Sequence, residues 1–194
     1  MSDSEIDTKT RILQASYELM EQQQGLYVSM SYIAKAANVS RQAVYLHFAS
    51  RAELMIATTR YVDDLKGLKE RLQQIRLAKS GIENVQACVN VWGYYIPEVY
   101  GIAKAMLMTR YSDEAMAAAW DSCMAGVRRF CKEAIIALDR DGQLNSLWSF
   151  EVAIDLFVTM MSVQNWEQLT VECGWSNERY VDHMQTLVKH TFIK

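Results

Sequence analysis

The sequence predicts an all-α protein in which a small N-terminal domain, residues 1–60, is joined to a larger helical domain, residues 61–194. Apolar residues recur at helical spacing along nearly the whole chain, which is the main signal for helices. One proline and eight glycines disfavour a turn-rich all-β architecture. Hydrophobic residues make up 51% of the 194, so the chain can bury a substantial core.

The small domain is predicted to begin with a helix that ends near Gly25, and its apolar face is formed by Ile12, Ala15, Leu19 and Met20. Serines are placed to cap the next helices, because a side-chain oxygen can accept hydrogen bonds from free N–H groups at a helix start. Ser29 precedes a short second helix, and Ser40 precedes a third of about seven residues. Ser50 and Glu53 have the spacing of a capping box and open a fourth helix.

The larger domain is predicted to contain longer helices. Residues 61–79 form one amphipathic helix, and residues 82–96 and 98–109 form two segments separated at Pro97, where helix continuation is costly. A long helix covers residues 113–139 and ends before Gly142. Ser149 and Ser176 are placed to cap the last two helices.

Residues 149–169 are apolar on almost every side, so a helix there needs partners on several sides. Self-association with the final helix in a four-helix bundle would bury these side chains, although a monomer with an unusually deep core is the alternative. The residues expected at a homodimer interface are Phe150, Ile154, Val158, Met161, Trp166, Tyr180, Met184 and Leu187.

Residues 28–55, VSMSYIAKAANVSRQAVYLHFASRAELM, have the layout of a helix-turn-helix. Ala34 is small where the two helices would cross, and Asn38 suits a positive φ in the turn. Val39 and Val44 would anchor the second helix from beneath. The polar residues that remain face outward at the end of the helix that enters a DNA major groove in such motifs.

Each exposed residue type has a mechanism for contacting DNA. Arg41 can donate to guanine or to phosphate, and Gln42 can pair with adenine. Tyr45 and His47 can donate to phosphates, and Arg51 lies beside the N-terminus of the fourth helix, which can bind another phosphate. The predicted DNA-binding residues are Ser29, Ser40, Arg41, Gln42, Tyr45, Leu46, His47 and Arg51. The alternative for any one of them is a merely solvated surface position.

Charge supports a polyanionic partner only mildly. The net charge is -3, but residues 8–60 carry six basic and three acidic side chains, so this segment is locally basic. The acidic, polar N-terminus is unlike a signal peptide, and we expect a cytoplasmic protein without a membrane segment. Cys88, Cys123, Cys131 and Cys173 lack CxxC spacing, which favours buried reduced thiols over disulfides or metal ligands.

The segments RILQASYELM, IAKAANVSRQAVYLHF and SRAEL, together with Gly25, resemble the tetracycline-repressor (TetR/AcrR) family of bacterial transcription regulators over residues 9–57. Three positions depart from the usual pattern. Asn38 stands where glycine is usual, Gln42 replaces a small residue, and Arg51 replaces lysine. The bulk of Gln42 makes the preferred operator unpredictable.

The resemblance implies a helix-turn-helix DNA-binding domain joined to an effector-binding and dimerisation domain. We therefore expect a homodimer that binds a palindromic double-stranded DNA operator and acts as a ligand-responsive regulator, most simply a repressor. A small, largely apolar or aromatic effector would change the separation of the DNA-reading heads. The residues that could line its cavity, unless they are ordinary core, are Trp92, Tyr95, Met108, Tyr111, Trp120, Met124, Phe157 and Met160.

The sequence disfavours two other classes of function. An enzyme is disfavoured because HExxH, GxGxxG, GxSxG and phosphate-binding glycine-loop motifs do not occur in the sequence. His47, His183 and His190 are too scattered for a persuasive metal site, and no cofactor is expected. A helical adaptor or small-molecule-binding protein that lacks DNA binding is the other alternative, and the basic, groove-facing residues argue against it.

Overall fold

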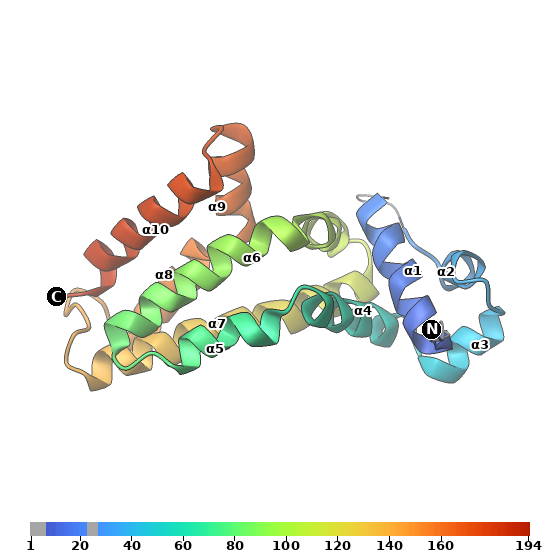
Figure 1. Cartoon of the computed structure of the whole chain (residues 1–194), viewed down its shortest axis with the longest axis horizontal. Helices are drawn as coiled ribbons and strands as arrows, with labels where there is room; N and C mark the ends of the chain where they lie inside the picture. Colours follow the sequence, from blue (N-terminus) through green and yellow to red (C-terminus); the bar gives the residue numbers. More distant parts are fainter. Residues whose placement is uncertain (1–6, 23–26) are drawn as a thin grey trace, which may run out of the picture. The chain divides into compact units, whose positions relative to one another are not determined.

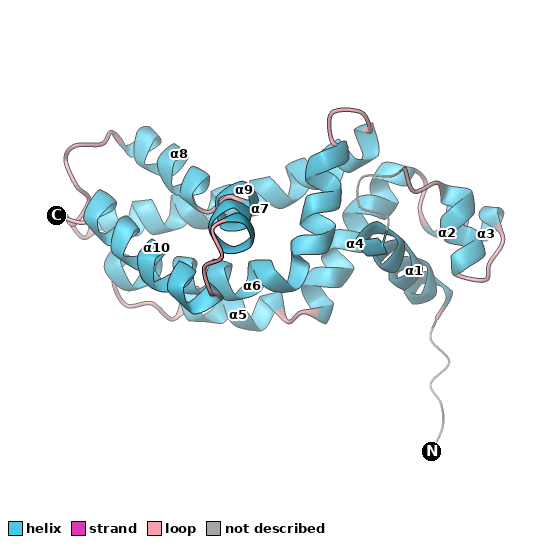
Figure 2. Ribbon diagram, turned by 90° about the horizontal axis from the view of Figure 1, so that it is seen from above, coloured by secondary structure: helices cyan, strands magenta, loops and turns pink. Residues whose placement is uncertain are grey.

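In a computed structural model, which describes residues 7–22 and 27–194, every regular element is helical (Figures 1 and 2). Within those residues the β interactions amount to one isolated antiparallel bridge, between Leu144 and Ile193. The all-α class predicted from the sequence is confirmed. The predicted helix end near Gly25 lies outside the described residues.

The chain forms two compact units that do not coincide with a division at residue 60. Unit 1 comprises residues 1–65 and 99–123, and unit 2 comprises residues 66–98 and 124–194. Unit 1 contains α1 (Thr8–Gln22), α2 (Met30–Ala36), α3 (Arg41–His47) and α4 (Arg51–Leu65), with the adjoining parts of α6 (Gly81–Thr109) and α7 (Glu114–Arg140). Unit 2 contains the rest of α6 and α7, with α5 (Leu68–Arg76), α8 (Phe150–Met160), α9 (Val163–Glu167), the π-helix η1 (Gln168–Glu172) and α10 (Asn177–Phe192).

The core of unit 1 joins α1 to the three helices that follow it. Ile12, Ile33 and Val44, from α1, α2 and α3, are each fully buried. The hydroxyl oxygens of Ser16 on α1 and Thr58 on α4 are buried 2.9 Å apart, and Thr58 also donates to the Leu54 carbonyl. These contacts satisfy the buried polar groups while burying the apolar face predicted for the first helix.

Unit 2 is closed by contacts between helices that are distant in sequence. The first residue of α6, Gly81, donates its N–H to the Asp141 carboxylate at 2.6 Å. On α10, Gln185 donates to the Asn90 side chain of α6 at 2.9 Å. The aromatic rings of Phe157 on α8 and Phe192 on α10 are both fully buried, with centroids 5.5 Å apart.

Two predicted helix boundaries are wrong. Pro97 lies inside α6 and does not divide it, although it removes a hydrogen bond to the carbonyl four residues earlier. The flanking Ile96 and Val99 are buried, so packing holds the helix through the proline. Residues 61–79 are not one helix, because Gly67 adopts φ 64° and separates α4 from α5.

The segment predicted to be helical over 149–169 is also interrupted. Ser149 caps α8 as expected, accepting from the Val152 N–H, but α8 ends at Met160. Ser162 then caps α9 by accepting from the Asn165 N–H, and the chain continues into η1. The change of direction lets apolar residues on several sides of the segment reach the core of unit 2 without a partner subunit.

Gly126 gives a small, testable effect on stability. It lies inside α7, and an added Cβ would meet no atom within 4 Å. Glycine weakens a helix interior because it loses the most conformational freedom on folding, so Gly126→Ala is expected to raise the free energy of unfolding by about 0.5–1 kcal/mol. Urea denaturation followed by circular dichroism measures it, and a loss of stability would contradict the open surroundings of this residue.

Candidate nucleic-acid interface

The turn between α2 and α3 is built by local hydrogen bonds that the sequence specifies. Ser29 accepts from the Tyr32 N–H at 3.2 Å at the start of α2. Asn38 adopts φ 53°, as predicted for the turn, and the next residue, Val39, donates its N–H to the Ala34 carbonyl at 3.0 Å. This pattern ends a helix in a left-handed residue and satisfies its last carbonyls. Ser40 then caps α3 by accepting from the Ala43 N–H.

The third helix presents one face to the core and one to solvent. Val44 and the following Phe48 are buried and anchor the helix against α1 and α2. Six predicted DNA-binding residues are all exposed: Ser40, Arg41, Gln42, Tyr45, Leu46 and His47. Ser29 is half-buried and serves as the cap of α2. The exposed face therefore has the donors and the apolar Leu46 that major-groove contacts require.

Arg41 and Tyr45 form a pair one helical turn apart on the exposed face of α3. The guanidinium carbon lies 5.6 Å from the Tyr45 ring centroid, and Nη2 lies 3.5 Å from the phenol oxygen. The hydrogen bond to Tyr45 raises the pKa of Arg41, so its charge is secure. The ring restricts the guanidinium without covering it, which lowers the entropy cost of placing Arg41 against a base or phosphate.

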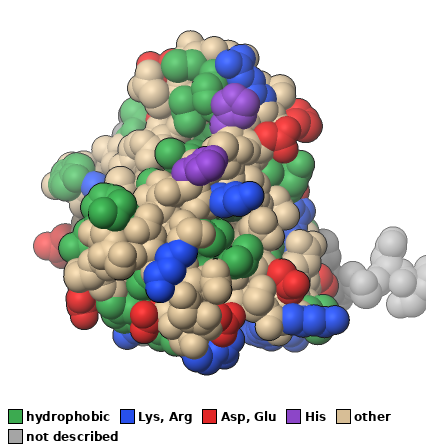
Figure 3. Space-filling view, turned by 90° about the vertical axis from the view of Figure 1, so that its left-hand side faces the viewer, with side chains coloured by type: hydrophobic (Ala, Val, Ile, Leu, Met, Phe, Trp, Pro, Cys, Tyr) green, Lys and Arg blue, Asp and Glu red, His purple; other side chains and the backbone are tan. Residues whose placement is uncertain are grey.

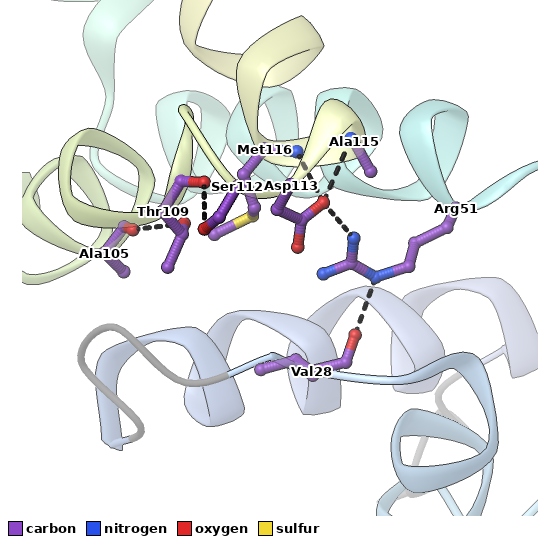
Figure 4. A network of polar contacts seen from close by, with 8 residues as sticks. All are labelled: Val28, Arg51, Ala105, Thr109, Ser112, Asp113, Ala115 and Met116. Carbon is purple, nitrogen blue, oxygen red and sulfur yellow. Dashed lines mark hydrogen bonds and ion pairs between the residues drawn. The ribbon is translucent and has the colours of Figure 1, made fainter.

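Arg51 occupies a different environment from the other predicted DNA-binding residues (Figure 4). Its Nη1 donates to Asp113 Oδ1 at 2.5 Å, and its Nε donates to the Val28 carbonyl at 2.7 Å. The Tyr27 ring covers the guanidinium, with 4.2 Å between the guanidinium carbon and the ring centroid. The side chain is only 12% exposed. In this conformation Arg51 is not available to a phosphate, contrary to the role expected from its place at the start of α4.

Asp113 is the residue at this site that sequence reasoning missed. It lies between α6 and α7, and its Oδ1 also accepts from the N–H groups of Ala115 and Met116, which caps α7. Its only local signal is that of a capping residue. Asp113 and Arg51 are 62 positions apart in the sequence, and no local pattern pairs them.

Five of the eight predicted dimer residues are buried in the core of their own subunit: Ile154, Met161, Trp166, Tyr180 and Met184. These side chains cannot supply the outer surface of an interface, because they are already buried within one subunit. Phe150 and Val158 are half-buried, and Leu187 is 47% exposed. Figure 3 shows that hydrophobic side chains reach the surface in separate patches on the face toward the C-terminus.

The predicted effector-binding residues are divided between the units. Met108, Tyr111 and Trp120 lie in unit 1, and the other five, Trp92, Tyr95, Met124, Phe157 and Met160, lie in unit 2. Met108 is 56% and Tyr111 84% exposed, so neither lines an enclosed cavity here. Helical spacing placed them together but does not identify which face of a helix is buried. A cavity of about 230 Å³ in unit 2 is lined by none of the eight.

Trp92 and Tyr180 place two polar atoms in the interior of unit 2. Neither the indole Nε1 of Trp92 nor the hydroxyl of Tyr180 has a well-formed hydrogen bond among the described residues. Burial raises the pKa of Tyr180 to about 12, and the nearby Trp92 side chain acts in the opposite direction. Tyr180 is therefore a neutral donor at ordinary pH.

Among the described residues, no group of three or more His, Cys, Asp or Glu side chains could hold a metal ion. All four cysteines are free: Cys88 and Cys131 are buried as expected, whereas Cys173 is exposed. No helix in the described part of the chain has both the length and the apolar character of a membrane span.

Comparison with known proteins identifies the N-terminal domain. Residues 12–58 match the family model described as "Bacterial regulatory proteins, tetR family". A nucleoid occlusion factor, SlmA, from Marinomonas sp. (strain MWYL1) is 29% identical over 82 residues, which is 42% of this chain and 41% of that protein. The chain thus aligns with less than half the length of that relative.

Solved structures share the fold over nearly the whole chain. A protein from Rhodococcus sp. described as a TetR-family transcriptional regulator has a TM-score of 0.73 and 20% identity, covering 95% of this chain and 98% of its own. AibR in complex with isovaleryl coenzyme A and operator DNA has a TM-score of 0.65 and 19% identity, covering 96% and 98%. At these identities the likeness establishes the fold.

Proposed function

Because its N-terminal domain places this chain in the tetR family of bacterial regulatory proteins, we propose that it is a ligand-responsive transcriptional repressor. It acts in the cytoplasm as a homodimer and binds a palindromic DNA operator through α3. A small effector held by the C-terminal helices changes its affinity for DNA. The domain boundary near residue 60 marks the end of the DNA-reading part.

The observation that carries the proposal is the exposed face of α3. Arg41 and Gln42 are the first two residues of α3 and Tyr45 follows one turn later, on a helix that Val44 and Phe48 fix from beneath. A recognition helix reads base edges from this end. Arg41 and Gln42 supply sequence preference, whereas Tyr45 and His47 contact phosphates and set the position of the domain on the duplex.

The dimer is supported by apolar side chains that remain at the surface of unit 2. Phe150, Val158 and Leu187 are only partly covered, and Val152 on α8 is 43% exposed. A two-fold axis through α8 and α10 would bury them against their copies. Two recognition helices then meet half-sites about 34 Å apart or a multiple of that.

Effector control is supported by the AibR structure, which holds isovaleryl coenzyme A together with operator DNA. In unit 2, the predicted lining residues are all buried or half-buried: Trp92, Tyr95, Met124, Phe157 and Met160. They favour an effector that is largely apolar or aromatic. The effector lowers DNA affinity to the extent that it prefers the conformation that DNA does not.

The proposal is tested by selecting a duplex from a random library with the purified protein and titrating it against random DNA. Arg41→Ala is expected to weaken binding to the selected duplex by about 1–3 kcal/mol per half-site and to relax the preference at one base pair. Arg60→Ala removes an exposed arginine from α4, away from α3, and should change binding by less than about 0.5 kcal/mol.

Two results would contradict the proposal. Failure to enrich any duplex, with equal and weak binding to all DNA at low salt, would favour an adaptor or small-molecule-binding protein of the same fold. Equal losses for Arg41→Ala and Arg60→Ala would mean that α3 contributes only general charge and does not read sequence.

A further inference from the structure

Arg51 has two roles that exclude each other. It is the first residue of α4 and follows the exposed recognition helix by only four positions, so an extended side chain there is placed to contact a phosphate. In the structure its guanidinium is instead turned to Asp113 and is nearly covered (Figure 4). Because the guanidinium is held by a carboxylate and its side chain is only 12% exposed, it is not accessible to a phosphate in this conformation.

The Arg51–Asp113 pair is incomplete. One carboxylate oxygen, Oδ1, takes the guanidinium and both N–H groups at the start of α7. Within the described residues, Asp113 Oδ2 and Arg51 Nη2 are buried without hydrogen-bond partners. Unpaired buried donors and acceptors are destabilising, so this pair is weaker than a two-fold arginine–carboxylate pair. A phosphate that can satisfy Nη2 as well as Nη1 is therefore a competitive partner for Arg51.

The position of Asp113 connects this pair to a long helix. Asp113 caps α7, which runs from Glu114 to Arg140, and the part of α7 after residue 123 belongs to unit 2. A change that shifts or frays the first turn of α7 therefore alters the hold on Arg51. The rest of the pair's surroundings, Val28 and Tyr27, belongs to the segment that leads into α2.

We propose that Asp113 is a latch on Arg51. With the pair closed, Arg51 is withheld from DNA; with the pair open, Arg51 contacts a phosphate beside the recognition helix. This inference rests on the proposed function and deepens it, because it names the residues through which α7 regulates DNA affinity. By linkage, an effector that favours the closed pair lowers the affinity for DNA by the same factor by which bound DNA lowers the affinity for that effector.

The test compares two variants that each remove one negative charge from adjacent residues. Asp113→Asn keeps a side-chain oxygen that caps α7, since asparagine and aspartate are similar caps, but it releases Arg51. Glu114→Gln removes the charge of the exposed neighbour and leaves the pair intact. On the duplex that wild-type protein enriches, Asp113→Asn is expected to bind about tenfold more tightly than Glu114→Gln at moderate salt. The salt slope, which is the slope of the logarithm of the binding constant against the logarithm of the salt concentration, should be the same for the two variants.

Arg51 itself is tested in the same titrations. Arg51→Gln is expected to weaken binding and to reduce the salt slope by about 1 per subunit, because one phosphate contact is lost. Arg51→Gln leaves the Asp113 carboxylate buried without its cation, which is destabilising in itself. The double variant Arg51→Gln with Asp113→Asn removes both charges and is therefore the matched comparison. In the double variant the gain from Asp113→Asn should disappear, and circular dichroism verifies that each protein is folded.

The outcomes separate the latch from the proposed function. If wild-type protein binds DNA but Asp113→Asn binds no better than Glu114→Gln, the Arg51–Asp113 pair has only a structural role and the latch is overturned. An unchanged salt slope for folded Arg51→Gln also overturns it. If no variant binds DNA, the proposed function fails and the latch fails with it. If wild-type protein enriches no duplex but the same selection with Asp113→Asn does, and that duplex is bound by Asp113→Asn alone, the latch is supported.

Discussion

Replacing Phe157 with alanine is expected to lower the free energy of unfolding of unit 2 by about 4 kcal/mol. The ring is fully buried on α8 and lies against the equally buried Phe192 of α10, with 5.5 Å between centroids. The substitution removes apolar surface from the core and leaves a cavity between two helices that the surrounding side chains fill only partly. Both effects lower the free energy of unfolding.

Urea denaturation at a fixed protein concentration measures this change, because association of subunits would make the apparent stability depend on concentration. Leu147→Ala is the matched control: it also truncates an apolar side chain, but Leu147 is 78% exposed and its loss should cost less than about 0.5 kcal/mol. A cost below about 1 kcal/mol for Phe157→Ala would contradict the packing of α8 on α10.

Gly81→Ala is expected to lower the free energy of unfolding by about 3 kcal/mol, although alanine is the better helix former. A Cβ at this position would lie 2.4 Å from the backbone nitrogen and 2.5 Å from the Cα of Leu138 on α7. A backbone cannot rotate out of the way as a side chain can, so α6 and α7 must separate. The 2.6 Å hydrogen bond from the Gly81 N–H to Asp141 would be strained by the same movement.

The same glycine-to-alanine change at Gly126 is the control for Gly81→Ala, because Gly126 has open space around it and the expected sign is opposite. Thermal unfolding of both variants, compared with wild-type protein, measures the difference. Equal stabilisation by the two substitutions would show that α6 begins farther from α7 than the structure places it.

Features that depend on a few neighbouring residues could be predicted from the sequence. The caps at Ser29, Ser40 and Ser149 are present because a serine just before a helical apolar pattern can accept a hydrogen bond from a free N–H group of the first turn. The left-handed Asn38 was predictable because the turn between α2 and α3 requires it. The exposed residues of α3 followed from the burial of Val44 and Phe48 at helical spacing.

Features that depend on distant packing could not be predicted. Pro97 breaks a helix by local rules, but the buried residues on both sides keep α6 continuous. The exposure of Met108 depends on which face of α6 finds a partner, and helical spacing is the same for either face. Arg51 was assigned to DNA because nothing near it in sequence reveals the carboxylate of Asp113.

Unit 1 is assembled from two stretches of chain, residues 1–65 and 99–123, with part of unit 2 between them. During translation the DNA-reading helices therefore leave the ribosome well before their remaining packing partners, among them Asp113. A nascent chain that ends at residue 65 has the recognition helix but leaves Arg51 without its carboxylate. Fusion proteins that transplant residues 1–65 onto another effector domain must carry residues 99–123 with them, or the graft will lack Asp113, the residue that we propose restrains Arg51.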